Sequence, residues 1–387
     1  MKTYFRRNLE QELTDALSRA PVVAILGPRQ CGKSTLAKEC LKQKDSIYLD
    51  LQNRVDRNKL SEPELFVELY RDKLICLDEI QLMPEFFRFL RSEVDANRTS
   101  GRFLILGSAS RELIKQSSES LAGRIAYLQL TPLLINEIEE PANWQTHWIR
   151  GGFPDSFLSR SESASLAWRN DFIQTFLNRD IPSLGFNIPA SLMERLWRLL
   201  AHYHGQTINY SKLANCLDIT TASVKKYLFL LEQTYMIRLL QPMEVNIKKR
   251  IIKAPKVYLR DSGILHKLLD IESFDQLLSN PHIGSSWEGY CIEHIINKLS
   301  GWRPSFLRTT NGAEVDLVME KGSQTLFFEF KMSKAPKLQR GFMELKNDIN
   351  PRHSWVISPV DSPYPLKNGV TVSSLFDIIE NKNLGSI

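Results

Sequence analysis

The chain has few cysteines and no long hydrophobic run. Five of its 387 residues are cysteine, and no two of them have CxxC spacing. The sequence therefore lacks the pattern of a zinc site or a disulfide framework, which agrees with a reducing cytoplasm. No window is apolar over the length that a bilayer requires, and residues Met1 to Arg7 lack the apolar core of a signal peptide. We expect a cytoplasmic protein with no membrane partner.

Internal repeats, low-complexity tracts and a strong charge imbalance are also absent. With 387 residues the chain is too long for one ordinary core, so we expect two or three domains. Its hydrophobic content of 43% and charged content of 24% are those of ordinary globular proteins, which excludes a disordered chain. The net charge of +6 permits contact with nucleic acid without requiring it, because scattered surface charge gives the same value.

Up to about residue 140, short apolar runs alternate with amphipathic stretches. This pattern is typical of an α/β fold in which crossover helices connect the strands of a parallel sheet. The predicted strands are Val22–Leu26, Ile47–Leu51, Leu74–Leu77, Phe103–Leu106 and Ile125–Leu130.

The pattern changes twice in the rest of the chain. From Trp148 to about Met243 the spacing of apolar residues is helical, and from Val245 onward strand-like and helical segments alternate. We predict domains at residues 1–140, 146–243 and 244–387, a connector at Glu139–Asn143 and a second junction near Gln241-Pro242.

A glycine-rich loop follows the first predicted strand and leads into a helix-like pattern. Strand, glycine loop, Lys-Ser and helix is the order that a phosphate-binding P-loop requires. Lys33 would reach the β- and γ-phosphates and Ser34 would ligate Mg²⁺, while backbone N–H groups bind the phosphates. A chance glycine turn before a helix is the alternative, which the full pattern in this context disfavours. The predicted nucleotide-binding residues are Gly27, Pro28, Arg29, Gln30, Cys31, Gly32, Lys33, Ser34 and Thr35.

The third predicted strand ends in two acids, Asp78 and Glu79. The carboxyl end of a buried parallel strand faces the ligand crevice. Asp78 would hold Mg²⁺ there, directly or through water, and Glu79 would orient and deprotonate the attacking water. A strand that ends in an ordinary acidic turn is the alternative, but the preceding P-loop favours a catalytic role.

Two further residues are candidates for contact with the transferred phosphoryl group. Ser108 follows the fourth predicted strand, where a hydroxyl can sense the γ-phosphate; an ordinary serine in a turn is the alternative. Arg124 ends the sequence Ser-Leu-Ala-Gly-Arg, and its guanidinium would stabilise transition-state charge in the same subunit or in a neighbour. A solvated surface arginine fits the same spacing.

Together these motifs resemble the AAA-type ATPases that carry a C-terminal domain of unknown function, DUF4143. The resemblance lies in Gly27-Pro28-Arg29-Gln30, Gly32-Lys33-Ser34, Leu77-Asp78-Glu79-Ile80-Gln81, Leu106-Gly107-Ser108 and Ser120-Leu121-Ala122-Gly123-Arg124. Further matches are Gly151-Gly152-Phe153-Pro154, Arg179-Asp180-Ile181, Pro255-Lys256-Val257-Tyr258 and Trp287-Glu288-Gly289. The resemblance covers nearly the whole chain and implies an additional-strand P-loop fold that uses ATP and Mg²⁺. Cys31 departs from the small aliphatic residue that the family often has.

The middle segment has the pattern of a helix–turn–helix in a winged-helix-like module. Lys225 and Lys226, near the start of its second helix, would contact DNA phosphates. A module that only packs between domains is the alternative, and no arginine lies early in that helix to read guanine, so base specificity is not expected. The expected core residues are Leu213, Ala214, Leu217, Val224, Leu228 and Leu231, and Lys248-Lys249-Arg250 falls where a wing would lie.

Two acids and a lysine have hairpin spacing in the last third of the chain. Asp316 lies at a turn-to-strand junction, while Glu329 and Lys331 alternate on the next predicted strand and share one face. Such a set can hold Mg²⁺ and polarise a phosphodiester. A solvated ion-pair face is the alternative, although charges among phenylalanines require partners.

These three residues resemble the core signature of the PD-(D/E)xK nuclease fold, which implies a restriction-endonuclease-like C-terminal α/β domain. That fold often adds a glutamate from an earlier helix. Glu288 and Glu293 are the candidates, and we choose Glu288 because it aligns with the apolar stripe of its helix. The fold alone does not establish cleavage.

The sequence therefore predicts a Mg²⁺-dependent ATPase that drives or gates action on nucleic acid, with DNA favoured over RNA. The alternative is an ATP-dependent regulatory switch that binds a protein partner and has a structural, non-cleaving C-terminal domain. If Arg124 acts on a neighbouring subunit, the protein must form a homo-oligomer.

Overall fold

The computed structural model describes residues 4–108, 121, 123–138, 143–244, 251–381 and 384. By its contacts the chain divides into two compact units, Met1–Leu133 with Gln233–Met236, and Leu134–Glu232 with Ile237–Ile387. Three sequence predictions fall wholly or partly outside the described residues: the connector before Asn143, the wing at Lys248-Lys249-Arg250, and Ser120 and Ala122 of the Ser-Leu-Ala-Gly-Arg motif.

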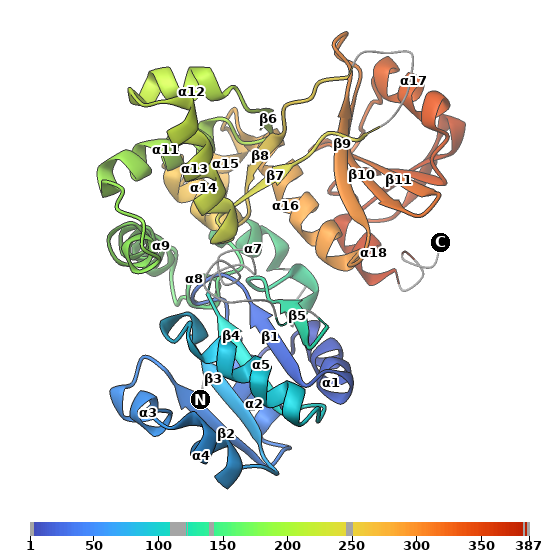
Figure 1. Cartoon of the computed structure of the whole chain (residues 1–387). Coiled ribbons are helices and arrows are strands. Elements are labelled where there is room, and N and C mark those ends of the chain that lie inside the picture. The colour runs from blue at the N-terminus through green and yellow to red at the C-terminus, as the bar shows by residue number, and fades with distance from the viewer. Residues whose placement is uncertain are drawn as a thin grey trace. The chain divides into compact units, whose positions relative to one another are not determined.

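The first unit is an α/β domain (Figure 1). Its elements are α1 (Leu9–Arg19), β1 (Val22–Leu26), α2 (Lys33–Leu41), β2 (Ser46–Asp50), α3 (Arg54–Lys59), α4 (Pro63–Leu69), β3 (Leu74–Asp78), η1 (Ile80–Leu82), α5 (Phe86–Ala96), β4 (Phe103–Gly107) and β5 (Ile125–Gln129).

The five strands of this unit form a parallel sheet in the order β2-β3-β4-β1-β5. The predicted parallel sheet is confirmed, and each strand begins and ends within one residue of its predicted bounds. Every residue of β1, β3 and β4 is buried. Strands covered on both faces consist of continuous apolar runs, which is why the sequence located them so closely.

The core of the first unit includes one face of α5. Phe86, Leu90 and Val94 recur at helical spacing and are buried together with residues of β3 and β4. Each side chain of this size contributes about 1.5–3 kcal/mol to folding when it is removed from water.

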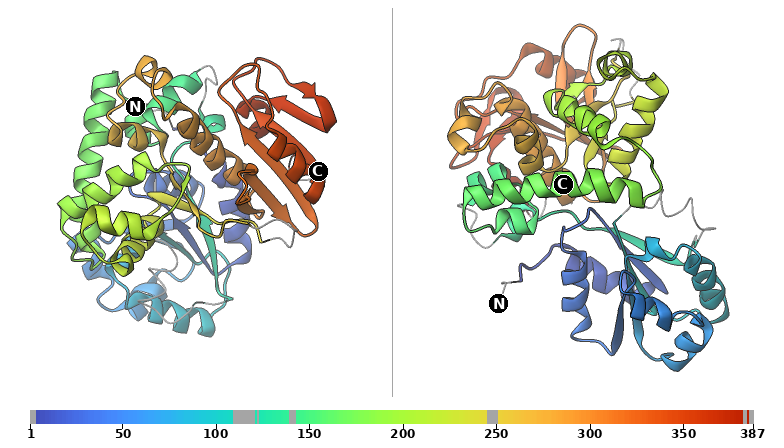
Figure 2. Two further views of the ribbon diagram at one scale, coloured as in Figure 1. Left: turned by 90° about the horizontal axis from the view of Figure 1, so that it is seen from above. Right: turned by 90° about the vertical axis from the view of Figure 1, so that its left-hand side faces the viewer.

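The second unit begins with helices and continues into two sheets (Figure 1). Its first elements are η2 (Ile135–Glu137), α7 (Trp144–Arg150), α8 (Pro154–Phe157), α9 (Glu162–Thr175), the π-helical turn η4 (Phe176–Asp180), α10 (Ile181–Ser183), α11 (Ala190–His202), β6 (Gln206–Thr207), α12 (Tyr210–Leu217), α13 (Thr221–Gln233), β7 (Ile237–Leu240), β8 (Lys256–Leu259), α14 (Ser262–Leu268) and α15 (Phe274–Leu278). The helix α9 runs directly through η4 into α10, and Figure 2 shows this stretch as one long coil.

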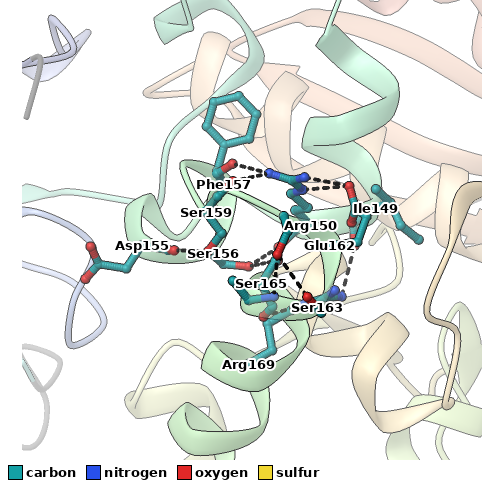
Figure 3. A network of polar contacts seen from close by, with 12 residues as sticks. Ile149, Arg150, Asp155, Ser156, Phe157, Ser159, Glu162, Ser163, Ser165 and Arg169 are labelled. Carbon is teal, nitrogen blue, oxygen red and sulfur yellow. Dashed lines mark hydrogen bonds and ion pairs between the residues drawn. The ribbon is translucent and has the colours of Figure 1, made fainter.

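Two arginines organise the start of this unit (Figure 3). The fully buried Arg169 donates from Nη1 to the carbonyl oxygens of Ile149 and Gly263, each at 3.1 Å. Arg150 pairs with Glu162 at 2.7 Å and also donates to the carbonyl oxygens of Phe157, at the end of α8, and Ser159. The guanidinium groups thus bind backbone oxygens of several helices and tie these helices together.

The helices α11 to α13 lead into a small antiparallel sheet in which β8 pairs with both β6 and β7. Side chains cap both helices of the turn: Asn209 accepts from the N–H of Lys212, and Thr220 accepts from that of Ser223. All six residues expected in the core of these helices are buried. The sheet extends beyond the boundary predicted at residues 243 and 244, and the division into three domains stays a prediction.

The C-terminal part of the second unit is a mixed sheet with helices. Its elements are α16 (Ile283–Lys298), β9 (Arg303–Arg308), β10 (Glu314–Lys321), β11 (Gln324–Phe330), α17 (Arg340–Ile349), β12 (His353–Ile357), β13 (Tyr364–Leu366), η5 (Lys367–Gly369), β14 (Val370–Ser373) and α18 (Leu375–Glu380). The strand order is β13-β14-β12-β11-β10-β9, with β9, β10 and β11 antiparallel and β11, β12 and β14 parallel. The helix α16 packs on β10 and β11, and α17 packs on β10. Within the described part of the chain, the helices are too short or too polar to cross a membrane.

Candidate functional site

The loop between β1 and α2 has the backbone geometry of a phosphate loop. A Cβ atom at Gly27 would lie 2.1 Å from the carbonyl oxygen of Leu130, so only glycine fits there. Gly32 has φ +103°, a conformation that favours glycine, and α2 begins at the next residue. Gln30 also has positive φ, and Cys31 is buried with Sγ 3.6 Å from the Leu130 oxygen.

The ammonium group of Lys33 lies inside this loop. Its Nζ donates to the carbonyl oxygens of Gly27 at 2.9 Å and Pro28 at 2.7 Å, and the residue is 6% exposed. Thr35, the last predicted loop residue, is exposed on the first turn of α2. The structure therefore places the positive charge of Lys33 at the N-terminus of a helix, where anions bind.

Arg7 fixes the loop from outside it and was not found from the sequence. Its Nη1 donates to the carbonyl oxygen of Cys31 at 3.0 Å, and its Nη2 donates to that of Thr131 at 2.6 Å. The side chain is buried, although it comes from the segment before α1. A buried arginine that binds backbone oxygens on two segments sets their spacing.

Ser34, in the first turn of α2, and Asp78, at the carboxyl end of β3, lie side by side. The hydroxyl of Ser34 donates to Oδ2 of Asp78 at 2.5 Å. The same oxygen accepts a very short hydrogen bond from Tyr48, and the backbone N–H of Glu79 binds Oδ1 at 2.9 Å. Burial, with the hydrogen bond to Asp78 adding to it, raises the pKa of the Tyr48 hydroxyl. Tyr48 therefore stays a neutral donor that orients the carboxylate.

Glu79 is positioned by its backbone and by two polar neighbours. It has φ 58°, ψ 45°, a left-handed conformation that is uncommon for a residue with a side chain. Its Oε2 accepts from Gln81 and lies 3.4 Å from the Ser108 hydroxyl, which Gln81 also contacts at 3.0 Å. Arg29 of the loop reaches Ser108 at 3.5 Å. The predicted residues Glu79 and Ser108 are thus brought together beside the loop.

Arg124 is not brought to this site within one chain. It precedes β5, whose first residue, Ile125, pairs with Val22 at the start of β1, whereas the phosphate loop follows the end of β1. A strand of five residues spans roughly 17 Å. Arg124 binds Asp95 through Nε at 2.5 Å and Nη2 at 3.0 Å, and this hydrogen bonding lowers the pKa of Asp95.

A hydroxyl, a carboxylate and an ammonium group thus surround one glycine loop. Serine and aspartate oxygens are the hard ligands that Mg²⁺ prefers, so Ser34 and Asp78 fit that ion. Lys33 has the charge to bind phosphate oxygens, and Glu79 adds a second carboxylate next to Asp78. When bound, Mg²⁺ would neutralise charge on the phosphates.

The predicted C-terminal residues converge on a carboxylate cluster, by which we mean Glu288, Glu314, Asp316 and Glu329. The register of β10 and β11 pairs Leu317 with Phe328, so Asp316 and Glu329 are the next opposing positions. The register of β9 and β10 shifts between Val315 and Val318, beside Asp316. Lys331 binds Oε1 of Glu329 at 2.7 Å, and the N–H of Phe330 binds Asp316 at 3.1 Å.

Lys256 of β8 also lies beside these carboxylates, and it was not predicted as a site residue from the sequence. Its Nζ is 2.6 Å from Glu314 Oε1, 3.0 Å from Glu288 Oε1 and 3.8 Å from Asp316 Oδ1. Tyr258, two residues on, donates a short hydrogen bond to the same Oε1 of Glu288. A lysine directly before the apolar run Val257-Tyr258-Leu259 was the available signal, because a buried charge requires partners.

The electrostatics of the cluster follow from burial. Burial raises the pKa of Glu329 to about 8, with the charge of Asp316 adding to the effect and Lys331 opposing it. Burial likewise raises the pKa of Glu288 to about 7 against the opposing charge of Lys256. Burial alone would lower the pKa of Lys256, but the neighbouring carboxylates raise it well above its ordinary value.

The other candidate glutamate, Glu293, lies elsewhere. It accepts from Arg238 at 2.5 Å and from Arg260 at 3.0 Å, and these two arginines overcome the effect of burial and lower its pKa to about 2. The structure therefore brings Glu288, and not Glu293, to the carboxylate cluster.

On α13 the lysines predicted to contact DNA are exposed. Lys225 lies 5.3 Å from the ring centre of Tyr210, and Lys226 lies 5.8 Å from that of Phe186. Both charges thus stay at the surface beside aromatic rings.

Comparison with known families divides the chain into three matched regions. Residues 19–139 match an AAA domain, residues 141–275 match a domain of unknown function (DUF8612), and residues 283–378 match a domain of unknown function (DUF4143). The N-terminal AAA domain and the C-terminal DUF4143 region agree with the resemblance seen in the sequence.

Relatives and solved structures extend this comparison. The chain is 39% identical over 365 residues to the uncharacterized proteins Rv2008c of Mycobacterium tuberculosis and Mb2031c of Mycobacterium bovis, which covers 94% of this chain and 82% of each relative. The Walker-type ATPase PABY2304 of Pyrococcus abyssi is 14% identical, with 69% of this chain and 96% of that chain covered and a TM-score of 0.48. The Thermotoga maritima RuvB Holliday junction branch migration motor is 19% identical, with 60% and 88% covered and a TM-score of 0.30. With TM-scores below 0.5, neither structure carries a conclusion about function.

Proposed function

This chain belongs to the family of the uncharacterized mycobacterial proteins Rv2008c and Mb2031c, and we propose that it is a Mg²⁺-dependent ATPase whose hydrolysis drives or gates action on nucleic acid. The AAA domain makes it a P-loop nucleoside triphosphatase. The observation that carries the proposal is the contact between Ser34 and Asp78 beside Lys33 and Glu79.

In this proposal each residue of the loop region has one role. Lys33 binds the β- and γ-phosphates, and Ser34 and Asp78 hold the metal ion. Glu79 takes the proton of the attacking water, and Ser108 orients Glu79 and senses the γ-phosphate. Lys33→Ala should abolish ATP binding and turnover; unchanged turnover in that variant would remove the proposal.

Action on nucleic acid is supported by the order of elements in the middle segment. Helix, short strand, two helices and two strands, with β8 between β6 and β7, is the order of a winged helix. In such a module the second helix of the turn enters the major groove of DNA, and α13 carries the exposed Lys225 and Lys226. With Lys225 and Lys226 bound to phosphates, we expect DNA binding that is salt-sensitive and independent of sequence.

The resemblance of the C-terminal domain to nucleases also supports action on nucleic acid. The closeness of Asp316, Glu329 and Lys331 supports a site like that of the PD-(D/E)xK nucleases, and Glu288 of α16 shares the Lys256 ammonium group with Asp316. Incubation of the protein with plasmid and Mg²⁺ or Mn²⁺, beside a Lys331→Ala control, tests cleavage. Cuts that depend on Lys331 would establish a nuclease.

A second candidate is an ATP-dependent switch that binds a protein partner and has a C-terminal domain that does not cleave. The specific observation in its favour is Lys256, which binds the carboxylates that a nuclease would offer to a metal ion. Absence of cuts together with ATP-sensitive association would favour the switch. Salt-sensitive DNA binding without cuts would leave a DNA-binding ATPase.

A further inference from the structure

The carboxylate cluster contains more positive charge than a nuclease signature supplies. That signature accounts for one ammonium group, Lys331, which binds Glu329. A second ammonium group, that of Lys256, comes from β8 of the small antiparallel sheet and lies within 4 Å of three carboxylates. Two ammonium groups, together with the guanidinium of Arg308 at 3.5 Å from Glu314, thus face four acids.

Lys256 is built into the cluster. Its side chain is 3% exposed, and its Nζ lies 5.5 Å from the ring centre of Phe306. A charge buried to this extent persists only with anionic partners, and Glu288 and Glu314 supply them at hydrogen-bond distance.

We propose that the ammonium group of Lys256 takes the place of the divalent cation that the nuclease fold would hold, so that the cluster is complete without metal. Oε1 of Glu288 accepts from both Lys256 and Tyr258, so two donors already occupy that oxygen. Mg²⁺ requires oxygen ligands at about 2.0–2.1 Å in an octahedral shell; the ammonium group of Lys256 supplies none, and the Tyr258 hydroxyl is directed to Glu288 as a donor. In the part of the chain that the structure describes, no group of three or more His, Cys, Asp or Glu is placed to hold a metal ion.

Glu329 keeps one carboxylate oxygen that the cations of the cluster do not bind. Its Oε2 is buried and accepts no hydrogen bond from the described residues. A single carboxylate oxygen does not make a Mg²⁺ site, but it could complete one if Glu288 and Asp316 were released from Lys256. Removal of the Lys256 charge should therefore create a cation site where the native chain has none. This inference concerns the second unit alone and holds whether or not the chain hydrolyses ATP.

Titration of the full chain with Mn²⁺, without nucleotide and with the free ion followed by electron paramagnetic resonance, tests the proposal. We expect Asp316→Asn to bind as much Mn²⁺ as the native chain. Lys256→Met should gain one further Mn²⁺ per chain, at Mn²⁺ concentrations at which the native chain shows no Asp316-dependent binding. The added Asp316→Asn change should abolish that gain. Lys321→Met, which removes an exposed lysine from the same strand as Asp316, is the matched control and should gain nothing.

Two results would overturn the proposal. One is Mn²⁺ binding by the native chain that Asp316→Asn removes; the other is a folded Lys256→Met chain that gains no ion. If circular dichroism shows that Lys256→Met does not fold, the comparison of the native chain with Asp316→Asn decides alone. Equal binding then supports the proposal, and an Asp316-dependent ion contradicts it. The ATPase proposal is tested separately: it fails if Lys33→Ala hydrolyses ATP as fast as the native chain.

Discussion

The hydroxyl of Ser34 donates a 2.5 Å hydrogen bond to Oδ2 of Asp78, which joins the start of α2 to the end of β3. Both oxygens are ligands suited to Mg²⁺, and Tyr48 donates to the same Oδ2 of Asp78. We expect Asp78→Asn to lower ATP turnover on the order of a hundredfold, because the amide carries no charge to hold the metal ion. Steady-state phosphate release at several Mg²⁺ concentrations measures this. Native turnover at low Mg²⁺ would show that Asp78 has no part in binding the ion.

Arg7 should control nucleotide affinity without contact with the nucleotide. Its hydrogen bonds to Cys31 and Thr131 position the phosphate loop, and hydrogen bonds from a charged donor contribute about 1.5–3 kcal/mol. We expect Arg7→Ala to weaken ATP binding about tenfold or more. The exposed neighbour Arg6 provides the control, since Arg6→Ala should bind ATP as the native chain does. Equal affinities for the two variants would contradict this role.

Arg124 should act on a neighbouring subunit if it stabilises the transition state. It lies at the amino-terminal end of the parallel strands, whereas the phosphate loop lies at their carboxyl-terminal end. Arg124→Ala should therefore leave ATP affinity unchanged while it slows turnover about a thousandfold. Mixing Arg124→Ala with Lys33→Ala should restore turnover, because each chain supplies what the other lacks. Arg98→Ala, at the same edge, is the control and should turn over ATP at the native rate. If mixing restores nothing, the arginine does not act between subunits.

Three buried histidines of the second unit should each remove stability as the pH falls below 6.5. Burial lowers the pKa of His204 and His266 to about 3 and that of His294 to about 4, so these rings stay neutral in the fold and gain protons on unfolding. The contribution of each histidine is therefore fully present above pH 6.5 and is lost toward those lower values, with a limiting slope of about 1.4 kcal/mol per pH unit. Glu288 and Glu329 contribute in the opposite direction, because their raised pKa values make the fold bind protons that the unfolded chain does not.

Urea unfolding at several pH values between 7 and 5 measures this loss. In His204→Gln the slope of the unfolding free energy against pH should fall, by an amount that approaches about 1.4 kcal/mol per pH unit at the low end of this range. His202→Gln, which changes an exposed histidine of α11, should keep the native slope. A native slope in the His204 variant would mean that His204 is not buried neutral.

The sequence predicted the first unit well because its signals are local. Buried parallel strands are continuous apolar runs, and Asp78 and Glu79 follow one of them directly. The position of Arg124 was also available from the sequence, since any residue that precedes a parallel strand lies opposite the loop that follows β1. Arg7 and Lys256 were not predicted, because each acts on segments that only tertiary packing brings near.

For the same reason the sequence left two interpretations of the C-terminal acids open, a metal site and an ion-pair face. Spacing showed that Asp316, Glu329 and Lys331 could meet on a hairpin, and they do. It could not show that a lysine from another sheet would share their neighbours, because charge balance in a buried cluster depends on every element that packs there.

The most direct test of the ATPase account is single-turnover hydrolysis by Glu79→Gln. The amide cannot take a proton from water, but it keeps the size of the side chain and its place beside Ser108. We predict that this variant binds ATP with native affinity and hydrolyses it at least about a hundredfold more slowly. Hydrolysis at the native rate with native binding would contradict the account.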